Sequence, residues 1–285
     1  MPRVRSKYVR PYFLLLLAVL ASTADAKGTA TAKVPKPPPL AWSSPAAGPT
    51  LTGDPELIFT FDDGPDPKRT PFVLDALKAH HIHAIFFMVG ARLENPEAQA
   101  IVDRILAEGH IIANHTMTHQ DLCHMKDDLV ANAEIDKGKQ IIEAQARMQM
   151  VWFRAPYGVR CVLLDDMLAA RGLWHFHWDL DPKEWKHNNT KRTIEYLEKN
   201  LPKITGRTVL LMHDIKTATV EALPIVLDWL DQENARRREL RIRRIRIIQS
   251  YDLAIEKMPA GLLDWLGEAA PDRAQLAQAV ASVLP

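Results

Sequence analysis

Residues 57–65 read Leu-Ile-Phe-Thr-Phe-Asp-Asp-Gly-Pro, an apolar β-rich run that ends in two acids and a turn. A short apolar run bounded by Gly and Pro predicts a buried strand. Adjacent side chains at a strand end normally point to opposite faces, but the Gly64-Pro65 turn breaks the pleat and lets Asp62 and Asp63 approach one site. By itself, this stretch is equally compatible with a turn that carries two solvated acids.

The same kind of run recurs along the chain, and amphipathic segments of helical length separate the copies. The expected strands are 57–61, 84–89, 111–114, 150–154, 173–178, 208–213 and 245–249. The expected helices are 71–80, capped by Thr70, and 96–108, 127–148, 162–171, 190–200 and 220–234. This alternation predicts an α/β fold, an irregular (β/α) barrel of about seven parallel strands with outer helices. An open doubly wound sheet is the alternative.

The two ends of the chain differ from this central region. Residues 1–26 combine a basic head, an apolar run and an Ala-x-Ala site, which is typical of a secretory signal peptide. The apolar run is far shorter than a bilayer span, so cleavage is expected rather than an uncleaved anchor, and the destination is secretion, the periplasm or the cell envelope. Residues 27–50 are expected to form a Pro-rich linker, 51–255 the catalytic domain, and 256–285 a C-terminal helical extension.

Charge is balanced over the whole chain but not within it. Lys and Arg total 36 against 35 Asp and Glu, a formal charge of +1, which gives no case for a dedicated nucleic-acid binder. Residues 236–246, however, contain seven arginines and one glutamate. The simpler interpretation is a solvated helix end that runs into the last strand, with Ile242 and Ile245 facing inward. The alternative is a strip that contacts an anionic polymer or a membrane surface.

Chemically unusual residues follow five of the expected strands. After Asp62 and Asp63 come His115 and His119, then residues 154–158 with Arg154, then 181–185, and finally His213. In either α/β architecture the carboxyl ends of the strands form the site, so these residues are expected to meet there. Two histidines four residues apart fall on one face of a helical turn and can present nitrogens to one metal ion, with a carboxylate from elsewhere.

These five motifs, in this order over about residues 57–251, resemble the polysaccharide deacetylases that share the nodulation-protein chitooligosaccharide deacetylase homology domain. Residues 60–65, 115–119, 154–157 and 211–213 match four motifs of that family. The remaining motif normally ends in Asp-Trp, whereas this chain has Glu184-Trp185 after Asp181. One extra methylene moves the carboxylate by about 1.5 Å, which predicts an altered hydrogen bond to the catalytic histidine and a lower activity or a shifted pH optimum.

The resemblance implies a metal-dependent hydrolase that removes acetyl groups from N-acetylglucosamine in peptidoglycan or a chitin-like polysaccharide. It implies a metal site of Asp63, His115 and His119, with zinc first and cobalt, nickel or iron as alternatives. The other implied roles are Asp62 as base, Arg154 as its support, His213 as acid, Glu184 and Asp181 as tuning residues, the Tyr157 backbone amide as oxyanion donor, and Tyr157, Pro156, Trp185 and Leu211 as the substrate lining.

Three other functions compete with this one. The same chemistry serves an acetylxylan-type O-deacetylase, and Glu184 makes a catalytically weak glycan-binding module conceivable. A non-haem iron oxygenase also uses two His and one carboxylate, but it needs neither a second acid, nor Arg154, nor His213.

The two cysteines, Cys123 and Cys161, do not fit a zinc pattern. In an oxidising compartment they are expected either to form a disulfide or to remain small buried residues.

Overall fold

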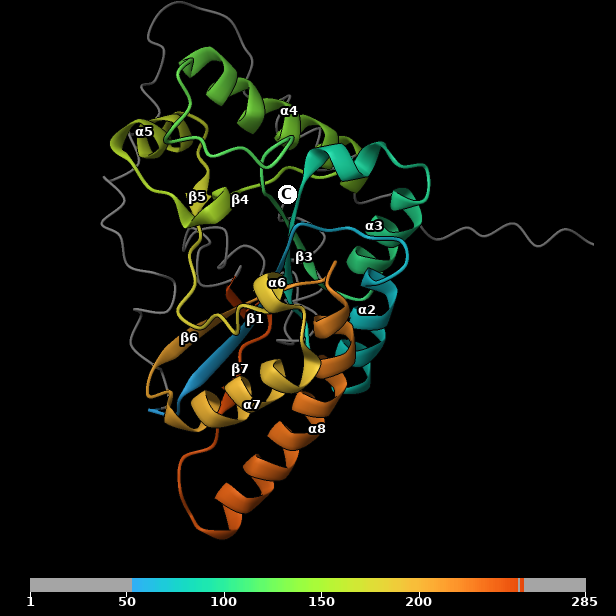
Figure 1. The fold of residues 1–285 in the computed structure, drawn as a ribbon, viewed down its shortest axis with the longest axis vertical. Coiled ribbons are helices and arrows are strands. Elements are labelled where there is room, and N and C mark those ends of the chain that lie inside the picture. Colours follow the sequence, from blue (N-terminus) through green and yellow to red (C-terminus); the bar gives the residue numbers. More distant parts are fainter. Residues whose placement is uncertain (1–52, 251, 254–285) are drawn as a thin grey trace, which may run out of the picture. The chain divides into compact units, whose positions relative to one another are not determined.

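The computed structural model describes residues 53–250 and 252–253 (Figure 1). The expected signal peptide (1–26), linker (27–50) and C-terminal extension (256–285) lie outside the described residues. Within the described part, no helix has both the length and the apolar character that a membrane crossing requires.

All seven expected strands are present, and all of their pairings are parallel. They are β1 (Glu56–Asp62), β2 (Ile85–Met88), β3 (Ile111–Asn114), β4 (Trp152–Phe153), β5 (Trp174–His175), β6 (Arg207–His213) and β7 (Arg246–Ile247). The sheet order is β5-β4-β3-β2-β1-β6, and β7 pairs with the first two residues of β1. Each strand from β1 to β5 therefore lies beside the next one in the chain.

The segment that follows β5 brings the sheet round toward a barrel. The backbone amides of Asp179 and Leu180 both donate to the carbonyl of Val209 in β6, at 2.9 and 3.0 Å. In return, the amide of Leu211 donates to the carbonyl of Leu180 at 2.9 Å. These bonds connect the two ends of the strand order, so the prediction of an irregular barrel is confirmed and the open doubly wound sheet is wrong.

The six expected helices are also present. They are α2 (Thr70–Ala79), α3 (Ala98–Ala107), α4 (Asp128–Ala146), α5 (Val162–Ala170), α7 (Thr190–Asn200) and α8 (Thr217–Glu239). Short helical turns occur at η2 (Gly90–Glu94), η3 (Pro156–Gly158), α6 (Glu184–His187) and η4 (Leu201–Lys203). Helices α7, α8, α2, α3 and α4 each pack against the next and form the outer layer (Figure 1).

Three local expectations are wrong. Thr70 is the first helical residue of α2 and not its cap, because its hydroxyl donates to the buried carboxylate of Asp214. Helix α8 extends beyond 220–234 at both ends and continues through Pro224. Ile242 is 48% exposed, because the chain turns outward at Arg241, whose φ is 55°, whereas Ile245 is buried as expected.

Alternation along the strands divides the apolar residues between two cores. In β1, Phe59 and Phe61 pack under the helices, whereas Ile58 packs inside the barrel with Phe87 and Val209. Since side chains alternate along a strand, Asp62 shares the inner face with Ile58. The buried strand β1 therefore places Asp62 at the carboxyl end of the barrel interior.

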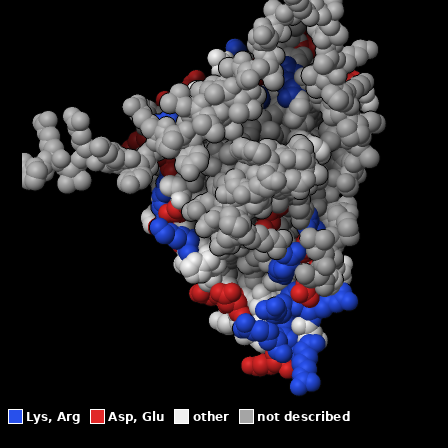
Figure 2. Space-filling model, turned by 180° about the vertical axis from the view of Figure 1, so that it is seen from behind, with Lys and Arg blue, Asp and Glu red and all other residues white. Residues whose placement is uncertain are grey.

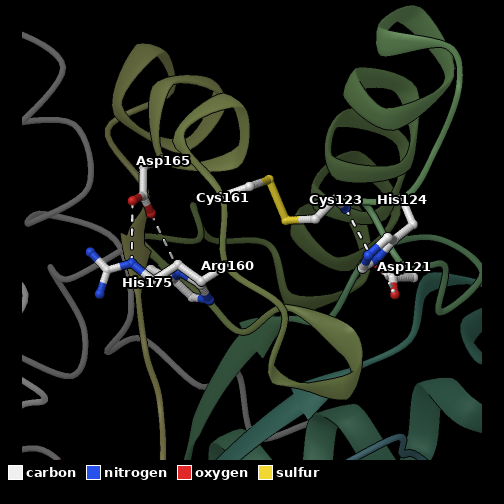
Figure 3. The surroundings of a disulfide bond; sticks show 7 residues. All are labelled: Asp121, Cys123, His124, Arg160, Cys161, Asp165 and His175. Carbon is white, nitrogen blue, oxygen red and sulfur yellow. Dashed lines mark hydrogen bonds and ion pairs between the residues drawn. A yellow bond between two sulfur atoms is a disulfide. The ribbon is translucent and has the colours of Figure 1, made fainter.

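A third apolar cluster lies between α4 and α5 and includes the disulfide between Cys123 and Cys161 (Figure 3). Cys161 immediately precedes α5, and Cys123 lies in the loop between β3 and α4. Around the disulfide, Asp121 accepts the amide of Cys123 and Asp165 contacts Arg160 and His175. The disulfide thus ties together the loops that follow β3 and β4.

Candidate active site

The predicted residues come together at the carboxyl edge of the sheet. Asp62 ends β1 and is in register with His213, which ends β6, and with Phe87 of β2. His115 directly follows β3, and Arg154 follows β4. Because the strands are parallel, these four end positions lie at one end of the barrel.

Asp63, His115 and His119 form a group whose three ligand atoms all lie within 4.8 Å of one another. The Oδ1 of Asp63 lies 3.1 Å from Nε2 of His119 and 3.5 Å from Nε2 of His115. Burial by itself would raise the pKa of Asp63, but the two neighbouring histidines outweigh it and hold that pKa well below its usual range. The carboxylate is therefore ionised in this group.

A neighbouring carbonyl fixes the orientation of His115. Its Nδ1 lies 2.7 Å from the backbone oxygen of Arg154, which can only accept, so Nδ1 carries the hydrogen. The other ring nitrogen, Nε2, faces Asp63 and is the one available to a metal ion. A second hydrogen bond of this kind is the usual support of a metal-binding histidine.

The two histidines do not lie on a helical turn, contrary to the sequence prediction. Thr116 and His119 have φ values of 67° and 61°, which interrupt any helix. Side-chain bonds hold the loop instead: Asn114 accepts the amide of Thr116, and Thr116 accepts the amide of His119 at 2.9 Å. A network of polar side chains, not helical periodicity, brings the rings together.

Helix α4 supports this loop from outside. Glu134 accepts the amide and the hydroxyl of Thr118, each at 2.7 Å. Gly138 lies against the loop so closely that an added Cβ would sit 2.6 Å from the carbonyl carbon of Thr116. No side chain fits there, so this glycine sets the distance between α4 and the His115 loop.

Asp62 is held by a buried arginine. Nη1 of Arg154 donates to Oδ1 of Asp62 at 2.6 Å and to the hydroxyl of Thr60 at 2.8 Å. Arg154 is fully buried and lies over the ring of Phe87. Oδ2 of Asp62 is the oxygen turned toward the candidate metal group, 3.7 Å from Nε2 of His115.

His213 is held by Glu184, the residue that departs from the family motif. Oε1 of Glu184 lies 2.9 Å from Nδ1 of His213 and also accepts its backbone amide at 2.7 Å. Burial would lower the pKa of His213, but the hydrogen bond and charge of Glu184 outweigh it and raise the pKa to about 9. The longer side chain therefore reaches the histidine.

Asp181, the other expected tuning residue, does not contact His213. Its carboxylate accepts the amide of Lys183 at 2.7 Å and the indole N–H of Trp185 at 3.4 Å. It orders the loop that carries Glu184 and Trp185.

The expected substrate-lining residues differ in accessibility. Tyr157 and Trp185 are exposed, and the Tyr157 ring meets the edge of His119 with 4.7 Å between centroids. Pro156 is buried, and Leu211 is buried on the face of β6 that also carries His213. Only the two aromatic rings are therefore freely available at the surface.

One buried acid was not singled out from the sequence. Asp214 is fully buried, accepts the hydroxyl of Thr70 at 2.5 Å and lies against Gly64, where an added Cβ would be 2.2 Å from its Oδ2. Burial, partly offset by the bond from Thr70, raises the pKa of Asp214 to about 7. The one sequence signal for Asp214 was its position directly after His213. Its contacts with Thr70 and Gly64, about 145 positions away, could not be predicted from the sequence.

Comparison with known proteins gives a consistent result. A family model described as polysaccharide deacetylase matches residues 51–173. A chitooligosaccharide deacetylase of Sinorhizobium fredii is 35% identical over 57% of this chain and 74% of its own length. A peptidoglycan-N-acetylglucosamine deacetylase of Bacillus cereus is 33% identical over 63% and 84%. Among solved structures, the peptidoglycan deacetylase PdaC of Bacillus subtilis is similar over 70% of this chain and 90% of its own, at 26% identity and a TM-score of 0.58.

Proposed function

The chain belongs to the polysaccharide deacetylase family, and from that premise we propose that it removes N-acetyl groups from N-acetylglucosamine residues of peptidoglycan or a chitin-like polysaccharide. The relatives that support this substrate class are named for chitooligosaccharide and for peptidoglycan N-acetylglucosamine. Amide hydrolysis needs a base for the attacking water and an acid for the leaving amine.

The single observation that carries the proposal is the pair formed by Asp62 and His213. They end neighbouring strands in register, and each is held by a side chain of the opposite kind. The guanidinium of Arg154 pairs with Asp62 at 2.6 Å, whereas the carboxylate of Glu184 lies 2.9 Å from Nδ1 of His213 and favours the imidazolium form of that histidine. One site thus offers a carboxyl group that can act as base beside a histidine that can act as acid.

The residues Asp63, His115 and His119 fit a divalent metal ion. They offer two imidazole nitrogens and one carboxylate oxygen, and among the described residues Oδ1 of Asp63 is buried without a hydrogen bond. This donor set suits zinc, and cobalt, nickel or iron are alternatives. When bound, such a cation supplies a Lewis acid that lowers the pKa of water and polarises the acetyl carbonyl.

The protein's own groups divide the proton transfers. Because Oδ1 of Asp62 is occupied by Arg154, its Oδ2 takes the proton of the attacking water. Because Nδ1 of His213 faces Glu184, its Nε2 delivers the proton to the sugar amine. The Tyr157 amide is proposed to stabilise the developing oxyanion.

Two exposed rings at the rim are proposed to bind the sugar. Tyr157 and Trp185 can stack on the apolar face of a pyranose, while Leu211 and Pro156 shape the floor for the acetyl group. Export is part of the same proposal, since residues 1–26 have the pattern of a signal peptide and the substrate polymers lie outside the cytoplasm.

The test is acetate release from purified peptidoglycan, chitooligosaccharides, poly-N-acetylglucosamine and acetylxylan, measured in parallel with Asp62→Asn as an inactive control. We expect release from at least one of the first three substrates and little from acetylxylan. Release from acetylxylan alone would replace the proposal by an O-deacetylase, and binding without any release would replace it by a glycan-binding module. Mass determination of the exported protein checks whether it begins at Lys27.

A further inference from the structure

The seven arginines between residues 236 and 246 fall into two groups. Arg236 and Arg237 both pair with Glu233, and Arg237 also donates to the carbonyls of Arg243 and Pro202. Arg246 pairs with Glu56, which is buried. Arg237 therefore joins the end of α8 to the segment after it and to η4, Arg246 joins β7 to the start of β1, and Arg236 pairs within α8 itself.

The other four arginines, together with the residues between them, form a surface that we call the basic cap, residues 238–244. Arg238, Arg241, Arg243 and Arg244 are exposed and form no ion pair within the part of the chain that the structure describes. The cap contains one acid, Glu239, so its net charge is +3. Figure 2 shows blue side chains, with some red ones among them, at the lower end of the picture, where α8 ends in Figure 1.

Two apolar side chains lie among these arginines. Leu240 is 56% exposed and Ile242 is 48% exposed. Single exposed apolar residues are common on protein surfaces, but here they alternate with guanidinium groups on one projecting turn. A surface of cations around apolar side chains matches the boundary between anionic headgroups and acyl chains.

The basic cap lies at the opposite end of the barrel from the candidate active site. Helix α8 starts soon after His213 and runs for 23 residues, or about 34 Å, to reach the cap. The cap leads into β7, whose Arg246 is in register with Glu56, the first residue of β1, whereas Asp62 is the last. The amide of Arg246 also donates to the carbonyl of Pro55, directly before β1.

We propose that the basic cap binds the surface of an anionic lipid membrane and holds the active-site edge away from it. The arginines would contact lipid phosphates, which their planar guanidinium groups recognise well, and Leu240 and Ile242 would enter the headgroup boundary. A soluble polyanion has no use for the two apolar side chains, which is why a membrane is the preferred partner. Each arginine near an anionic surface contributes about fivefold to the partition coefficient.

The test is cosedimentation of the exported, naturally processed protein with phosphatidylcholine vesicles that contain or lack about 30 mol% phosphatidylglycerol. The quadruple variant R238Q/R241Q/R243Q/R244Q removes the cap charge. The matched control, K126Q/K137Q/K191Q/R192Q, removes four charges from exposed residues of the loop before α4, α4 itself and α7. L240S/I242S removes the apolar contribution. Unfolding temperatures verify that each variant is folded.

We expect salt-sensitive binding to the anionic vesicles only, a loss of at least about 20-fold in the cap variant and at most about twofold in the control. L240S/I242S should lose about fivefold or more. Equal binding by the cap variant and the wild type would overturn the proposal. The proposal would also be overturned if L240S/I242S bound the vesicles as well as the wild type did, and bound dextran sulfate equally well. The partner would then be an anionic polymer. Binding is measured without substrate, so the outcome does not depend on the proposed activity.

Discussion

Oε1 of Glu184 accepts hydrogen bonds from both the ring Nδ1 and the backbone amide of His213, at 2.9 and 2.7 Å. Glu184 is fully buried, and its other oxygen has no hydrogen-bond partner among the described residues. Its Oε1 also accepts the hydroxyl of Thr219 at 3.3 Å, but the two shorter hydrogen bonds come from His213, and Glu184 raises the pKa of that histidine to about 9. At neutral pH the ring carries the proton that a general acid must donate.

Glu184→Gln should move the alkaline limb of the pH–rate profile to lower pH. Because the acid works only when protonated, activity falls as the pH rises through the pKa of His213. Removing the charge of Glu184 lowers that pKa from about 9, so the loss of kcat should be largest in alkaline buffer and smaller in mildly acidic buffer. Initial rates of acetate release, measured for both proteins across the pH range, give the shift of the alkaline limb.

Glu184→Asp is the matched control, because it keeps the charge and has the residue usual in the family. Its alkaline limb should lie between those of Glu184→Gln and the wild type, because the charge stays while the shorter side chain lengthens the hydrogen bond to His213. An unchanged limb in Glu184→Gln would contradict the assignment of Glu184 as a tuning residue.

Asp62→Asn and His213→Ala should each lower kcat by at least about 100-fold. Their effects on stability should differ. Asp62 is the side-chain counter-ion of the fully buried Arg154, so its loss should also lower the unfolding temperature, whereas His213→Ala leaves no arginine unpaired. Acetate release and thermal unfolding separate the two effects, and near-normal acetate release from either variant would reject its assigned role.

His119→Ala should abolish zinc binding with little loss of stability, because its side chain is 29% exposed. Titration calorimetry of the chelator-treated protein measures the zinc affinity directly. In the wild type, chelation should silence deacetylation, and zinc or cobalt should restore it. Activity that survives exhaustive chelation would remove the metal from the proposed function.

The barrel was predictable because its signals are local. Each strand is a short apolar run, and alternation along β1 places Phe59 and Phe61 toward the helices and Ile58 and Asp62 inward. The motif residues were predictable as a set because parallel strands end at one edge.

The shape of the site was not predictable, because distant contacts determine it. The spacing of His115 and His119 indicated a helical turn, yet Asn114 and α4 hold a non-helical loop. The burial of Asp214 against Gly64 joins the first and last motifs and leaves no periodic signal. Likewise, α6 has only four residues, too few for a pattern.

The disulfide should stabilise the site as well as the fold. Cys123 and Cys161 are 38 residues apart, and closing a loop of that length contributes about 4 kcal/mol through the unfolded chain. Cys123 follows His119 by four residues, and Cys161 follows Tyr157 by four. The disulfide therefore joins the two loops that carry His119 and Tyr157, whose rings are in contact. The variant Cys123→Ser/Cys161→Ser should therefore melt at a lower temperature and bind zinc more weakly. A reductant should lower both the melting temperature and the zinc affinity of the wild type, and it should change neither in the double variant. If the double variant melts at a lower temperature but binds zinc with unchanged affinity, the disulfide acts on stability alone.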